Sequence, residues 1–112
     1  MKYRIEGKLV AYLSGPITGV ADYREKFAEA ERRLSEYGYI VLNPAVLPKG
    51  LDAQDYMQID FAMIDAADFI VMLPGWRKSR GARLEVSYAE YVEKEVYELE
   101  EFLHGRGREA AQ

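Results

Sequence analysis

Apolar residues along this chain alternate between short unbroken runs and stretches with helical spacing. The runs at residues 8–14, 39–42 and 69–73 are rich in Val, Ile, Leu and Tyr, and Gly, Pro or Asn follows each of them. Such short, closed runs are typical of buried strands. A weaker run at residues 96–99 predicts a further strand.

Three segments between these runs have the period of amphipathic helices. In the first, Asp22 is a plausible N-cap, apolar residues recur every three or four positions up to Tyr37, and Gly38 ends the pattern. The segments 55–67 and 84–92 show the same spacing, and the polar tail from His104 is expected to fray.

Strands that alternate with helices predict an α/β fold, in which a parallel sheet of four to five strands has helices on both faces. Right-handed crossovers would bring the loops after the first and third strands to the same edge of the sheet. In open α/β sheets ligands bind at that carboxyl edge, so these two loops are the predicted site.

Length and composition limit the function. The 112 residues, 49% of them hydrophobic, suffice for one domain spanning 1–112, and so small a fold favours a homodimer or higher homo-oligomer. The net charge of -4 argues against a nucleic-acid binder. With no cysteine and one histidine, no metal or other cofactor is expected. The chain shows no signal peptide or membrane span, which predicts a cytoplasmic protein without a membrane partner.

The loop after the third predicted strand leads into Glu85. We expect this carboxylate in the first turn of the following helix, where the helix dipole favours its ionised form. An ionised carboxylate can act as a nucleophile or stabilise a cation. The ordinary alternative is a glutamate that only complements the dipole.

A second carboxylate can come from the segment before the third strand, which carries Asp60, Asp65 and Asp68. Asp65 and Asp68 lie at element boundaries, where capping is the usual role. Asp60 lies between apolar neighbours instead and is the better candidate for an acid. Two carboxyl groups in different environments are the common means of splitting a glycosidic bond.

The loop after the first strand offers ligand contacts. Gly15 and Gly19 permit close approach of the backbone, while Ser14 and Thr18 offer hydroxyl groups. Tyr12 can stack on a base or hydrogen-bond a carboxylate, although a tyrosine within a strand is more often part of the core.

The second loop is basic. Arg77, Lys78 and Arg80 can hold a phosphate, although solvated basic residues are common in loops. Trp76 beside them can cover a base or pack the loop.

These motifs resemble one family. The segment 12–19 (Tyr-Leu-Ser-Gly-Pro-Ile-Thr-Gly), then Asp60 and Asp68, then 79–85 (Ser-x-Gly-Ala-x-x-Glu) resemble the nucleoside 2-deoxyribosyltransferase superfamily. Order and spacing are most similar to the small 2'-deoxynucleoside 5'-phosphate N-hydrolases and to a related phage-associated domain family of unknown function. The resemblance implies a flavodoxin-like or Rossmann-like fold and, in many members, homodimers with shared sites.

The resemblance also implies roles for single residues. Glu85 matches the nucleophile that attacks the anomeric carbon, Asp60 matches the acid that assists the leaving base, and Tyr12 matches the tyrosine that orients the carboxylate. Ser79 matches a serine that holds the 5'-phosphate. The predicted substrate-binding residues are Ser14, Gly15, Pro16, Ile17, Thr18, Gly19, Ser79, Arg80 and Gly81.

The chain departs from the hydrolases at Pro16 and Thr18, where they carry a serine and an arginine for phosphate. Arg77, Lys78 or Arg80 would then donate to phosphate from the opposite side. The predicted function is an N-glycosidase acting on a nucleoside or deoxynucleoside, or on its 5'-monophosphate. The alternatives are a deoxyribosyltransferase that exchanges bases and a non-catalytic nucleotide-sensing module.

Overall fold

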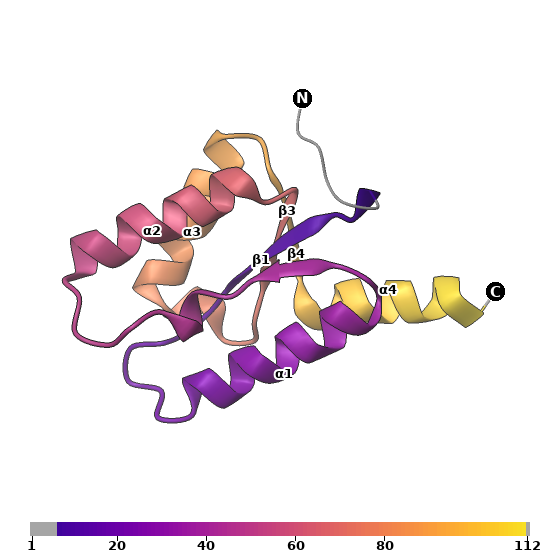
Figure 1. Cartoon of the computed structure of the whole chain (residues 1–112), viewed down its shortest axis with the longest axis horizontal. Helices are drawn as coiled ribbons and strands as arrows, with labels where there is room; N and C mark the ends of the chain where they lie inside the picture. The colour runs from indigo at the N-terminus through magenta and orange to yellow at the C-terminus, as the bar shows by residue number, and fades with distance from the viewer. Residues whose placement is uncertain (1–6, 112) are drawn as a thin grey trace.

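Four parallel strands form one sheet with the order β2-β1-β3-β4 (Figure 1). The structure, a computed structural model, describes the backbone of residues 7–111 and the side chains of residues 7–105. The strands are β1 (Val10–Ser14), β2 (Ile40–Leu42), β3 (Phe69–Met72) and β4 (Glu95–Glu98). Each lies within one or two residues of a predicted apolar run, so the α/β fold with a parallel sheet is confirmed.

Helices cover both faces of the sheet. They are α1 (Tyr23–Glu36), α2 (Ala53–Ala66), α3 (Arg80–Tyr91) and α4 (Leu99–Ala111). Helices α2 and α3 lie together on one face, and α1 and α4 pack on the other (Figure 1). No described helix is both long and apolar enough to cross a membrane.

The alternation of side chains along each central strand divides the core into two clusters. On β1, Ala11 and Leu13 pack with α1 and α4, whereas Val10 and Tyr12 pack with α2 and α3. Successive side chains of a strand point to opposite faces, so each face of β1 serves one helix pair.

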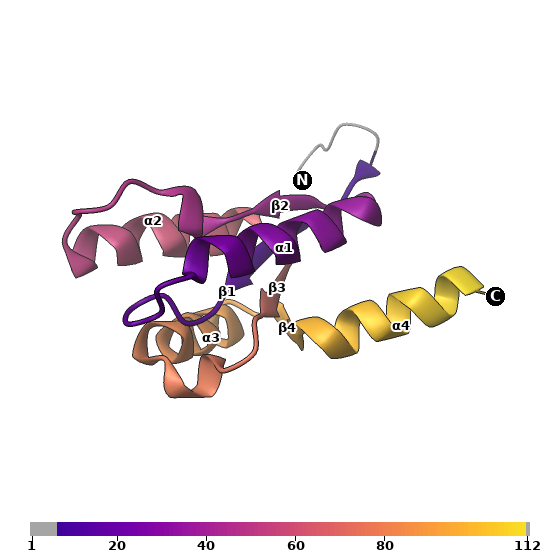
Figure 2. The ribbon, with the colours of Figure 1, turned by 90° about the horizontal axis from the view of Figure 1, so that it is seen from below.

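The C-terminal segment differs from the prediction. The tail from His104, expected to fray, belongs to helix α4, which begins at Leu99 directly after β4. Leu99 and Leu103 are buried against the core and Phe102 packs beside them, so the apolar positions follow the i, i+3, i+4 spacing of a helix. Figure 2 shows α4 extending away from the sheet.

The parallel arrangement brings the two predicted loops together. Strands β1 and β3 are neighbours, with Ser14 paired in register with Met72, so the chain leaves both strands at the same edge. The prediction that the loops after the first and third strands share one edge is therefore confirmed. Short 3-10 turns, Pro44–Val46 and Trp76–Lys78, follow β2 and β3.

Candidate active site

Glu85 lies on the inner face of α3, under the carboxyl edge of the sheet. Only 6% of its surface is exposed. Ser79 is the N-cap of α3, and its side chain accepts a hydrogen bond from the backbone N–H of Ala82. Glu85 therefore falls in the second turn, not in the first turn as expected, and the helix N-terminus contributes little to its charge because that effect fades within one turn.

Two hydroxyl groups from β1 bind the carboxyl group of Glu85. Tyr12 Oη donates to Glu85 Oε1 at 2.9 Å, and Ser14 Oγ donates to the same oxygen at 2.7 Å. Both side chains are almost fully buried. Of the two roles considered for Tyr12, the structure shows the hydrogen bond to a carboxylate.

Asp60 supplies the second carboxyl group, from the face of α2 that packs toward α3. It is 7% exposed, and a hydrogen bond with Glu85 contributes to the pKa of each group. Among the described residues, Oδ1 of Asp60 has no hydrogen-bond partner. A buried, unpartnered carboxyl oxygen is costly unless it is protonated or meets a ligand, so the pair is unusual for a purely structural contact.

Burial dominates the electrostatics of this cluster. It raises the pKa of Glu85 from the ordinary 4.5 to about 8, the proximity of Asp60 adds to this, and the hydroxyls of Ser14 and Tyr12 act in the opposite direction. Burial likewise raises the pKa of Asp60, and raises that of Tyr12 well above its usual value, to which the nearby charges of Glu85 and Asp60 add. The two carboxyl groups therefore hold protons to unusually high pH, as acid catalysts do.

The other two aspartates considered from the sequence lie elsewhere. Asp65 Oδ1 accepts a hydrogen bond from Tyr88 Oη at 2.7 Å on the exposed side of α2 and α3. Asp68 Oδ2 accepts from the backbone N–H of Val10 at 2.7 Å, at the amino end of β1 and therefore opposite the carboxyl edge of the sheet. Both contacts agree with a structural role for these residues.

The loop after β1 packs closely against Leu73, the residue directly after β3. A Cβ atom at Gly15 would lie 2.8 Å from Leu73 Cβ, so only glycine lets the two loops approach this closely. Pro16 and Ile17 are half-buried, and Ile17 packs against the core next to α1 and α4. Thr18 and Gly19 are exposed at the tip.

The second loop places further predicted residues at the start of α3. Ser79 and Gly81 are half-buried, and a Cβ atom at Gly81 would lie 3.8 Å from Met57 Cε on α2. Arg80 and Lys78 are exposed. These residues lie within two turns of Glu85 along the same helix or in its preceding loop.

Arg77 is already engaged within the protein. Its guanidinium group stacks over the ring of Trp76 at 4.6 Å and pairs with Glu98 at the end of β4, with a shortest distance of 3.2 Å. Trp76 itself packs against the core cluster on the face of the sheet that α2 and α3 cover. Lys78 and Arg80 are therefore better placed than Arg77 to meet an anion from solution.

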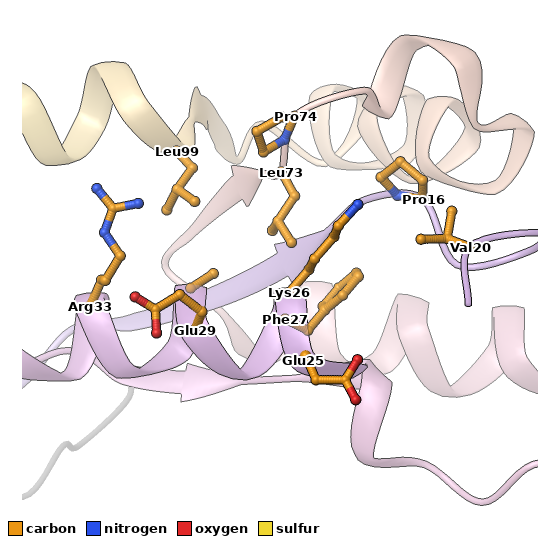
Figure 3. A pocket seen from close by; sticks show the side chains of 11 residues that line it. Pro16, Val20, Glu25, Lys26, Phe27, Glu29, Arg33, Leu73, Pro74 and Leu99 are labelled. Atoms are coloured by element: carbon orange, nitrogen blue, oxygen red, sulfur yellow. The ribbon is translucent and has the colours of Figure 1, made fainter. Parts of the chain in front are cut away.

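A pocket of about 440 Å³ lies on the opposite face of the sheet, between α1 and the loops (Figure 3). Its lining consists of Pro16, Val20, Glu25, Lys26, Phe27, Glu29, Ala30, Arg33, Leu73, Pro74 and Leu99. The charged members all come from α1, and the remaining residues are apolar. Neither carboxyl group of the Asp60 and Glu85 pair lines it, and Pro16 is the one predicted binding residue that does.

The sequence analysis did not predict two features of this region. The residues of the first loop suggested that the Ser14 hydroxyl meets the substrate, whereas the structure places this hydroxyl on Glu85. The signal was the alternation along β1, because Tyr12 and Ser14 are two residues apart and must share a face. The pocket beside α1 depends on Leu99, the start of the unpredicted helix α4.

The described residues contain no group of three or more His, Cys, Asp or Glu side chains arranged to hold a metal ion. The chemistry that these residues can offer is instead that of two carboxyl groups with raised pKa values. One of them is oriented by two hydroxyl donors. Such an arrangement can deliver a proton and present a carboxylate to an electrophilic carbon.

A parallel α/β sheet with a buried carboxyl pair at its carboxyl edge defines a class of Rossmann-like proteins with an enzyme-like site. Within that class, the chain belongs to the family described as "Domain of unknown function (DUF4406)", whose model matches residues 9–98. No curated protein matches the chain.

Among solved structures, the fold is similar to that of the CMP N-glycosidase BcmB of Clostridium botulinum. The TM-score is 0.58 and the sequence identity is 19%, over 80% of this chain and 66% of that one. The chain thus spans slightly less than two thirds of that enzyme. The likeness supports a nucleotide-glycosidase-like fold.

Proposed function

We propose that this protein is an N-glycosidase that cleaves the bond between base and sugar in a nucleoside or deoxynucleoside, or in its 5'-monophosphate. The observation that carries the proposal is the buried pair of Asp60 and Glu85, with two hydroxyl groups donating to one oxygen of Glu85. The fold likeness to an enzyme named as a CMP N-glycosidase supports the same substrate class.

In the proposed reaction Glu85 is the nucleophile and Asp60 is the acid. A carboxylate oxygen of Glu85 forms a bond to the anomeric carbon as the bond from that carbon to the base nitrogen breaks. The carboxyl proton of Asp60 passes to the departing base. Water then attacks the glycosyl ester, gives a proton to the Asp60 carboxylate, and releases the sugar and Glu85.

In the proposed roles the pair must pass its proton from Glu85 to Asp60 before the base leaves. Glu85 accepts two hydroxyl hydrogen bonds, which stabilise its anion, whereas Asp60 keeps one buried oxygen without a partner. The hydrogen bond between the two carboxyl groups raises the pKa of Glu85 and lowers that of Asp60, so in the free protein a single proton is held on Glu85. The hydroxyl groups of Ser14 and Tyr12 lower the pKa of Glu85 and favour the reactive form, in which substrate binding has moved the proton to Asp60. That form has the nucleophile ionised and the acid protonated.

The two loops at the carboxyl edge are the proposed substrate contacts. Gly15 to Gly19 would lie along the nucleoside, with Ser79 and Gly81 at the start of α3 opposite them. For a monophosphate, the exposed side chains of Lys78 and Arg80 supply the positive charge beside Ser79.

The test is release of free base from a panel of ribo- and deoxynucleosides and their 5'-monophosphates, followed by chromatography. Glu85→Gln should abolish release, because an amide is a poor nucleophile. The matched control is Glu90→Gln, which changes an exposed glutamate on the same helix and should leave release unchanged.

Parallel reactions with an added acceptor base distinguish hydrolysis from base exchange, since only the latter yields a new nucleoside. If no substrate loses its base, with or without an acceptor, the catalytic proposal is wrong. Binding without turnover by both wild type and Glu85→Gln would indicate a sensing module.

A further inference from the structure

Ser14 is the residue whose place in the structure differs most from its expected role. Its side chain is 1% exposed, at the last position of β1, and Oγ lies 2.7 Å from Glu85 Oε1. A serine hydroxyl has a single proton to donate, and here it is donated to Glu85. While that bond holds, the hydroxyl has no proton left to give to a ligand.

The two hydroxyls of β1 act on one oxygen only. Tyr12 Oη also donates to Oε1, at 2.9 Å, so Oε1 accepts both bonds and Oε2 accepts neither. Hydrogen bonds to a carboxylate withdraw charge from the accepting oxygen and fix its position. The hydrogen bond between Glu85 and Asp60 ends when Asp60 gives its proton to the leaving base, and Oε2 is then the more nucleophilic oxygen. Rotation of the carboxylate would break both hydroxyl bonds to Oε1.

We propose that Ser14 is a positioning residue that, together with Tyr12, anchors Oε1 of Glu85 and so selects Oε2 as the attacking oxygen. This rests on the proposed role of Glu85 as the nucleophile. The register of β1 explains the pairing, because residues two apart on a strand project from the same face toward α3. Ser14 thereby belongs with Glu85 and not with the residues that contact substrate.

The decisive variant is Ser14→Ala, which removes one donor with little change in volume. The matched control is Ser87→Ala, which removes an exposed hydroxyl on the helix that carries Glu85. Tyr12→Phe removes the other donor and should act in the same direction as Ser14→Ala.

The first readout is the titration of the Glu85 carboxyl carbon by NMR in protein labelled at the glutamate side-chain carboxyl, with the signal assigned by its loss in Glu85→Gln. Removing a donor to the anion should raise the pKa of Glu85 by about one unit, a tenfold fall in its dissociation constant. Ser87→Ala should leave the titration unchanged. An unchanged or lowered pKa in Ser14→Ala would overturn the proposal.

The second readout is steady-state kinetics. A positioning role predicts a fall in kcat with KM nearly unchanged, whereas a substrate-binding Ser14 would raise KM and leave the titration unmoved. An active Ser14→Ala enzyme with unaltered kcat overturns the positioning role alone. A wild-type protein that releases no base overturns the proposed function and the positioning role with it, while the titration still reports whether the hydrogen bond exists.

Discussion

Both faces of the sheet border the loops after β1 and β3, but the surroundings at this edge are polar on one face and apolar on the other. On the face of α2 and α3, Tyr12, Ser14, Asp60 and Glu85 form a buried polar cluster. On the face of α1 and α4, an apolar pocket of about 440 Å³ lies beside Phe27. The difference shows that the polarity of a residue's surroundings at this sheet edge depends on which side of β1 the residue faces. Proximity to the loops does not decide it.

Gly15 and Leu73 separate the two regions. Their close approach, with 2.8 Å between Leu73 Cβ and a Cβ placed at Gly15, seals the first loop against the second. Pro16 lines the apolar pocket beyond this contact, while Ser14 before it faces Glu85. Between Ser14 and Pro16 the environment of the chain therefore changes from polar and buried to apolar.

After the loss of release in Glu85→Gln, the largest expected effect also falls on the polar side. Asp60→Asn keeps the size of the side chain but cannot donate an acidic proton, so kcat for base release should fall by about 10²–10⁴-fold. The loss should shrink for substrates whose base leaves readily without protonation. Asp55→Asn, at an exposed position on the same helix, is the control. An equal loss for all leaving groups would mean that Asp60 is not the acid.

On the apolar side, a change should affect stability instead of chemistry. Phe27 is 1% exposed and forms a wall of the pocket, so Phe27→Ala should lower the free energy of unfolding by about 3 kcal/mol. Urea denaturation measures this. Activity per folded molecule should stay within about twofold of wild type. A loss of turnover without a loss of stability would place the pocket within the active site and contradict the separation of the two faces.

The polar cluster should also make stability depend on pH. In the folded protein Glu85 keeps its proton up to a pKa of about 8, whereas its ordinary pKa is 4.5. The folded state thus binds more protons in this window, so stability should fall as pH rises from about 4.5 to about 8. The raised pKa of Asp60 acts in the same direction.

At about 1.4 kcal/mol per pKa unit, the free energy of unfolding should fall by a few kcal/mol across this pH window. Glu85→Gln should flatten the profile and make the protein more stable than wild type at pH 8, as measured by urea unfolding from pH 5 to pH 9. Exposed carboxyl groups with lowered pKa values, such as Glu29 and Glu100, act below this window. A wild-type stability that rises through the window would contradict the burial of an ionisable pair.

Much of the fold followed from periodicity alone. The central strands are apolar apart from Ser14, and Gly or Pro follows each within two residues. Helix α1 has a regular apolar face, so local pattern and tertiary structure agree there. Helix α4 was missed because its apolar anchors among the described side chains are Leu99, Phe102 and Leu103, and mostly polar residues follow them in the sequence. Packing against the sheet stabilises that first turn, and packing is not visible in local spacing.

The site was predictable in its parts but not in its contacts. The resemblance supplied roles for Glu85, Asp60 and Tyr12, and the structure brings these three side chains together. The hydrogen bond of Ser14 required the register of β1 against α3. The expected stabilisation of Glu85 by the helix dipole is wrong, because the N-cap at Ser79 puts it one turn further along. Burial therefore governs the pKa of Glu85, and the sequence carries no direct measure of burial.

The smallest expected effect comes from the charged rim of the apolar pocket. Arg33 forms two hydrogen bonds with Glu100, at 2.8 and 3.0 Å, but their side chains remain 33% and 64% exposed. Water screens such a pair, so a double-mutant cycle with Arg33→Gln and Glu100→Gln should give a coupling below about 1 kcal/mol. Added salt should reduce it further. A coupling well above that value would show that the rim is shielded from solvent, and the α1 side would then resemble the buried polar cluster across the sheet more than its exposure suggests.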